Sequence, residues 1–180
     1  MDLETVVIKK EEHIATITLN RPERLNAVSV QMVDDLLMAF RDIDSDDEMR
    51  VLVVTGSGEA FCSGADIDLL AGIFGKRPRV VWHLIRTLQQ AILTLHRFRT
   101  PTIAMINGVA TGAGFEIASA CDMRIASENA SFVVASMRRG TIPDFGGTWF
   151  MPRLMGMAKA AELVFTGNAL GAEEAEKVGL

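Results

Sequence analysis

Apolar residues follow two spacings along the chain, and each spacing predicts one kind of element. Continuous or alternating apolar runs are typical of strands, and we expect strands at 6–8, 13–19, 51–55, 102–106, 123–126 and 132–134. Apolar residues that recur every three or four positions predict helices at 29–43, 66–73, 81–95 and 113–120. After Pro143 the pattern predicts two or three more helices, the last near 173–180. Strands that alternate with helices along 180 residues indicate an α/β fold in one domain.

Composition and charge narrow the range of functions. The net charge is −5 and no block of basic residues is present, which argues against nucleic acid or an anionic membrane surface as a partner. No apolar run is long enough to span a bilayer, and the acidic N-terminus resembles no signal or transit peptide. Cys62 and Cys121 have no metal-ligand spacing around them and suggest a reducing compartment. We therefore expect a cytoplasmic protein without a metal site.

The segment Asn107–Glu116 is the strongest single indication of chemistry. It is rich in glycine and alanine, and it places one carboxylate at the start of a predicted helix. Small residues let backbone N–H groups approach a ligand, and a helix start leaves several of these donors unpaired. Such an arrangement suits an enzyme that stabilises an oxyanion beside an acid or base. The alternative interpretation is a glycine-rich turn with a glutamate on the surface.

Three further segments decide between these interpretations. They are Arg21–Ala27, Ala60–Ile67 and Gly140–Thr148, and the last supplies a second carboxylate in a glycine-rich turn. Together with Asn107–Glu116, in this order and spacing, they resemble the crotonase superfamily of enoyl-CoA hydratases and isomerases. The resemblance implies an α/β spiral of β-β-α units, of the ClpP/crotonase type. It also implies an acyl-CoA thioester as substrate, no cofactor beyond that CoA, and a homo-oligomer, either a trimer or a hexamer.

The resemblance covers the chain from about residue 6 to its end and implies a single crotonase-like domain over 1–180. Relatives continue into further helices that close the site, and we expect this chain to lack that C-terminal helical region.

The resemblance also assigns residues. The amides of Ala65 and Ala113 match the two backbone donors that grip the thioester oxygen, although many relatives have glycine at the second position. Glu116 matches a catalytic acid of the family, and Asp144 matches a position that is catalytic in some isomerases. The segment that lines the CoA arm in relatives, largely through its backbone, matches Ala65, Asp66, Ile67 and Asp68. Arg24 matches a basic residue near the CoA phosphates, with a solvated surface arginine as the alternative.

The reaction is the point on which the sequence departs from the family pattern. Hydratases of the family carry a second glutamate twenty residues after the first, and here that position is Ser136. A serine cannot act as a carboxylate base, so we expect Asp144 to be the second acid, unless it only caps the following helix. We expect hydration of a 2-enoyl-CoA, with isomerisation of an enoyl-CoA, a dienoyl-CoA or a ring-derived CoA ester as the alternative. A non-catalytic CoA-binding or scaffold protein is the remaining alternative, and the two retained acids argue against it.

Overall fold

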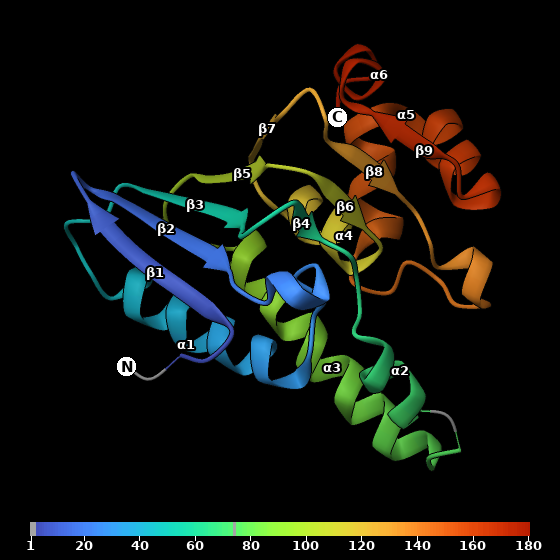
Figure 1. The fold of residues 1–180 in the computed structure, drawn as a ribbon, viewed down its shortest axis with the longest axis horizontal. Coiled ribbons are helices and arrows are strands. Elements are labelled where there is room, and N and C mark those ends of the chain that lie inside the picture. The colour runs from blue at the N-terminus through green and yellow to red at the C-terminus, as the bar shows by residue number, and fades with distance from the viewer. Residues whose placement is uncertain (1–2, 74) are drawn as a thin grey trace.

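The computed structural model describes residues 3–73 and 75–180, which form two sheets with helices around them (Figure 1). Its strands are β1 (Val6–Glu11), β2 (Ile14–Leu19), β3 (Val51–Gly56), β4 (Ala60–Cys62), β5 (Thr102–Ile106), β6 (Val109–Thr111), β7 (Met123–Ala126), β8 (Ser131–Val133) and β9 (Ala169–Gly171). Its helices are α1 (Val30–Asp44), α2 (Ile67–Ile73), α3 (Pro78–His96), α4 (Ala113–Ala120), α5 (Gly147–Thr166) and α6 (Ala172–Lys177), with short 3₁₀ turns at Pro22–Arg24 and Met137–Arg139.

From β3 to β8, successive strands alternate between the two sheets. The first sheet has the order β1-β2-β3-β5-β7 and the second has the order β4-β6-β8-β9. The chain therefore runs from β3 to β4 and then to α2 and α3, from β5 to β6 and then to α4, and from β7 to β8 and then to α5. Pairing is parallel except where β1 meets β2 and where β8 meets β9. This is the spiral of β-β-α units that the resemblance implies.

The predicted helices and the longer strands are confirmed, with ends that differ by a few residues. Ser29 is the N-cap of α1, where its hydroxyl accepts a hydrogen bond from the Met32 amide at 3.1 Å. The sequence analysis did not predict β4, β6 or β9. Each has only three residues, and β4 and β6 lie within glycine-rich stretches that we interpreted as turns.

Helix α4 lies in the interior, and all eight of its residues are buried. Glycine allows α4 to pack directly against the backbone of β4. A Cβ at Gly114 would overlap the Cys62 carbonyl oxygen. The pairing of Cys62 with Ala110 aligns β4 with β6, so the segments that follow the two strands lie side by side. The packing of the core therefore places the start of α4 next to the turn at Gly64.

No helix within the described ranges is long and apolar enough to cross a membrane.

We expect Gly114→Ala to destabilise the fold by about 3 kcal/mol, because the added methyl has no room against β4 and overpacking a core strains the backbone. The matched control is Gly72→Ala in the exposed part of α2, where a new Cβ meets no atom within 4 Å and alanine favours the helix. Urea unfolding measures both variants. Equal stabilities for the two would contradict the close packing of α4 on β4.

Candidate active site

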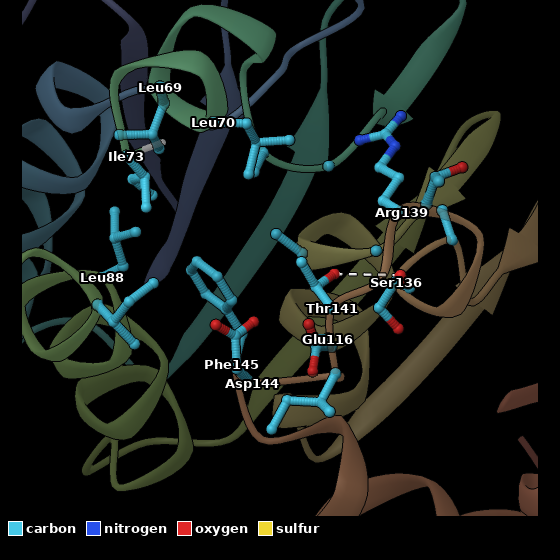
Figure 2. Close-up of a pocket in the computed structure, with 18 of the residues that line it drawn as sticks. Leu69, Leu70, Ile73, Leu88, Glu116, Ser136, Arg139, Thr141, Asp144 and Phe145 are labelled. Carbon is cyan, nitrogen blue, oxygen red and sulfur yellow. Dashed lines mark hydrogen bonds between the residues drawn. The ribbon is translucent and has the colours of Figure 1, made fainter. Parts of the chain in front are cut away.

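A cavity of about 510 Å³ opens beside the start of α4. Its size is typical of pockets that hold small-molecule ligands. Figure 2 shows Glu116 and Asp144 on one side of this cavity, with apolar side chains from α2 and α3 on the other. The apolar wall consists of Leu69, Leu70, Ile73, Ile85 and Leu88. The cavity therefore combines an apolar surface with two carboxyl groups.

The backbone of two neighbouring segments forms another part of the cavity wall. Gly64 has a φ of +103° and lies so close to Thr111 that a Cβ would stand 2.9 Å from its carbonyl oxygen. This glycine turns the chain so that Ala65 follows at the cavity surface, opposite Ala113. Within the described residues, no hydrogen bond is recorded from the amide of Ala65, and Ala113 is the first residue of α4, where no intrahelical acceptor exists.

The methyl group of Ala113 is compatible with this geometry. Ala113 is not among the residues with positive φ, so alanine adopts the backbone conformation without strain. Ala65 and Ala113, the two residues that the resemblance assigns as backbone donors, line the same cavity.

Glu116 is 4% exposed and sits in the first turn of α4. Its Oε1 accepts a hydrogen bond from the Gly147 amide at 2.7 Å. Burial raises the pKa of Glu116 to about 8, the Gly147 hydrogen bond opposes the rise, and the charge of Asp144 adds to it. Glu116 therefore keeps its proton at neutral pH and is an acid that can donate it.

Asp144 is half-buried and lies in the segment before α5. Burial raises the pKa of its carboxyl group as well. Since two neighbouring carboxylates repel each other, the pair favours a state with one proton and one negative charge. The cavity thus holds a carboxylic acid beside a carboxylate.

Ser136 also lines the cavity. Its Oγ is buried and has no hydrogen-bond partner among the described residues, while its carbonyl oxygen accepts a hydrogen bond from the Thr141 hydroxyl at 3.1 Å (Figure 2). A buried hydroxyl without a partner is rare and indicates a place for water or ligand.

The residues predicted to contact CoA are only partly brought together. The Asp66 carboxylate is 4% exposed and points into the protein, where the guanidinium of Arg21 binds it at 2.8 Å. Burial would raise the pKa of Asp66, but the Arg21 hydrogen bond and charge, with the Asp68 amide, lower it. Only the backbone of Asp66 is left for a ligand.

Three of the other predicted CoA contacts lie at the surface. Ile67 is 71% exposed and lines the cavity mouth. Arg24 and Asp68 form an exposed ion pair at 3.6 Å, a type of contact that contributes little to stability. Arg24 therefore remains accessible to an anionic ligand.

The sequence analysis missed the roles of Arg21 and Gly147. Arg21 also donates to the Ala27 carbonyl oxygen at 2.6 Å, so one guanidinium links its own turn to the Asp66 segment. The Gly146–Gly147 pair at the start of α5 was visible in the sequence, but the hydrogen bond from the Gly147 amide to Glu116, 31 residues away, was not.

Comparison with known proteins shows the family to which the chain belongs. A model of the enoyl-CoA hydratase/isomerase family matches residues 9–180. The chain belongs to this family. It is 38% identical over 179 residues to 1,2-epoxyphenylacetyl-CoA isomerase of Escherichia coli strain K12, covering 99% of this chain and 68% of that relative. It is 36% identical over 188 residues to the short-chain-enoyl-CoA hydratase of Clostridium acetobutylicum, covering 100% of this chain and 68% of the relative.

Solved structures show the same fold. The crystal structure of an enoyl-CoA hydratase from Bacillus anthracis superposes with a TM-score of 0.91 at 34% identity, over 98% of this chain and 68% of that one. The chain thus spans about two thirds of the length of the relatives that it matches.

The raised pKa of Glu116 predicts a pH-dependent loss of stability. Between pH 4.5, the ordinary value for glutamate, and about 8, the unfolded chain releases this proton while the folded chain keeps it. Folding stability should fall through this window by a few kcal/mol, at about 1.4 kcal/mol per pKa unit. Urea unfolding at pH 5 and pH 8.5 should therefore show Glu116→Gln gaining stability relative to wild type at the higher pH.

The control for this measurement is Glu128→Gln, which changes an exposed glutamate away from the cavity. A stability difference between wild type and Glu116→Gln that stays constant from pH 5 to pH 8.5 would show that Glu116 is ionised normally.

Proposed function

We propose that the protein hydrates a 2-enoyl-CoA to a 3-hydroxyacyl-CoA. The observation that carries this proposal is the arrangement of Glu116 and Asp144 in one cavity with the unpaired amides of Ala65 and Ala113. The amides form the oxyanion hole, where they hold the thioester oxygen as the enolate develops. Preorganised donors of this kind stabilise transition states by about 3 kcal/mol each in other enzymes.

The two carboxyl groups divide the proton transfers between them. Asp144, as the carboxylate, takes a proton from water as the water oxygen bonds to the β carbon. Glu116, as the neutral acid, gives its proton to the α carbon, so that one water is added across the double bond. The buried hydroxyl of Ser136 is suited to orienting that water, because it lacks a partner within the protein.

The thioester reaches this site with its CoA arm along Ala65–Asp68 and its phosphates near Arg24. The side chain of Asp66 is engaged by Arg21, so this segment offers its backbone. The chemistry consists of proton transfers and water addition, and it requires no cofactor beyond the CoA that the substrate carries.

Isomerisation of a double bond or of a ring-derived CoA ester is the second candidate. Ser136 replaces the second glutamate of the hydratase pattern, and a 38% identical relative is named an isomerase. In this reaction the carboxylate of Asp144 removes a proton from one carbon, and Glu116 returns a proton to another. The mass of the substrate is then unchanged.

We also propose that the protein is a cytoplasmic homo-oligomer, a trimer or a hexamer. The outer side of the first sheet exposes Met105, Met123 and Ile125, and Met105 pairs with Ile125 in register. Adjacent exposed apolar side chains of this kind are typical of a protein–protein contact. The two free cysteines, both buried, are consistent with a reducing compartment.

Mass spectrometry of crotonyl-CoA after incubation tests the proposed reaction. We expect the gain of one water, and we expect Glu116→Gln and Asp144→Asn each to lower kcat by about 100-fold or more, since each removes a proton-transfer group. KM should change little, because neither residue holds the CoA arm.

Glu128→Gln serves as the control and should keep wild-type turnover. An unchanged mass with a shifted double bond, seen with 3-enoyl or dienoyl thioesters, would show that the reaction is isomerisation and not hydration. Full activity in Asp144→Asn would show that Asp144 has a structural role and no catalytic one.

A further inference from the structure

The segment 142–145 separates the catalytic cavity from a second hollow. The second is an open groove of about 650 Å³ between α3 and the start of α5, lined among others by Gln89, Leu93, His96 and Trp149. Ile142, Asp144 and Phe145 line both spaces. Phe145 is 7% exposed and anchors one end of the segment in the core. Asp144 has open space on two sides, so packing alone does not fix its orientation.

The backbone of this segment forms few hydrogen bonds with other backbone groups, although the Phe145 amide interacts with the Glu116 carboxyl group. Across the described ranges, no backbone–backbone hydrogen bond outside helices and strands involves residues 142–145. The Asp144 carbonyl oxygen is held from α3, where the Gln89 side-chain amide donates to it at 2.7 Å. The neighbouring residues Leu88 and Ile92 are buried, so this face of α3 is fixed against the core.

The position of Asp144 also affects Glu116. The negative charge of Asp144 contributes to the raised pKa of Glu116, and this contribution requires that the two carboxyl groups stay close. A rotation of the Asp144 peptide would carry its side chain away from Glu116 or away from the substrate. The orientation of one carbonyl group therefore matters for both acids.

We propose that Gln89 is a positioning residue, which fixes the Asp144 peptide so that the carboxyl group faces Glu116 and the reacting carbons. The catalytic part of this proposal rests on the proposed function, and the effect on Glu116 does not. Gln89 makes no contact with the reacting atoms. It acts by restricting Asp144.

The adjacent residue provides a matched control. Gln90 is exposed, and its side-chain amide bonds to the Thr94 hydroxyl of the same helix at 3.4 Å. Substitution by methionine keeps the length of the side chain and removes the donor at either position. Gln89→Met and Gln90→Met therefore make the same chemical change one residue apart, and only the first breaks the link to Asp144.

The experiment measures kcat and KM for crotonyl-CoA, and separately the pH at which stability to urea falls. We expect Gln89→Met to lower kcat 10- to 100-fold with KM within twofold, because misplacing a catalytic group by about 1 Å has this effect. The pH midpoint of the stability loss should move down by up to about one unit, since Glu116 loses a charged neighbour. Gln90→Met should match wild type in both.

Unchanged kcat and an unchanged pH midpoint in Gln89→Met would overturn the proposal, as would equal effects in the two variants. A loss of stability at every pH, without a change in midpoint or kcat, would show a purely structural role and would overturn it too. Gln89→Leu repeats the test if the methionine variant does not fold. If wild type turns over no thioester, the proposed function fails, and the pH midpoint still decides whether Gln89 positions Asp144.

Discussion

The burial of one carboxyl group in the interior helix α4 is the constraint on which the rest of the site depends. An ionised glutamate at this position would be expensive, because the surrounding helix is buried along its whole length. The hydrogen bond from Gly147 lowers the free-energy cost of ionisation but does not remove it, so the pKa of Glu116 rises to about 8. The same burial that destabilises the fold above neutral pH keeps Glu116 protonated near neutral pH, the state that the proposed reaction requires. In this proposal, Glu116 links stability and catalysis through a single group.

Small residues make this placement possible. Gly114 lets α4 contact β4 directly, and Gly64 turns the chain against Thr111, so that two backbone segments from different parts of the sequence reach the same cavity. The pairing of β4 with β6 keeps them aligned. Consequently, the amides and the acid are fixed by backbone geometry and core packing rather than by flexible side chains. Asp144 is the exception, because its segment lies between two open spaces and its carbonyl oxygen accepts a hydrogen bond from a side chain of α3.

The sequence predicted the fold class and the longer elements because their apolar spacing is local. The family resemblance assigned Glu116, Asp144, Ala65 and Ala113 to one site, and all four line one cavity, although their roles remain proposals. The short strands β4, β6 and β9 were missed, and the first two lie in glycine-rich stretches that we interpreted as turns. The partners of buried polar groups were missed for a different reason. Arg21 reaches Asp66 across 45 residues, and no local pattern encodes such a contact.

The most direct test of this account is the protonation state of Glu116. Carbon-13 NMR of the protein labelled at glutamate side-chain carboxyl groups, with Glu116→Gln to assign the signal, gives its pKa by titration. We predict a pKa near 8 in wild type and a lower value in Asp144→Asn, where the neighbouring charge is removed. A value near the ordinary 4.5 in wild type, or one that does not respond to Asp144→Asn, would contradict the coupled pair of acids.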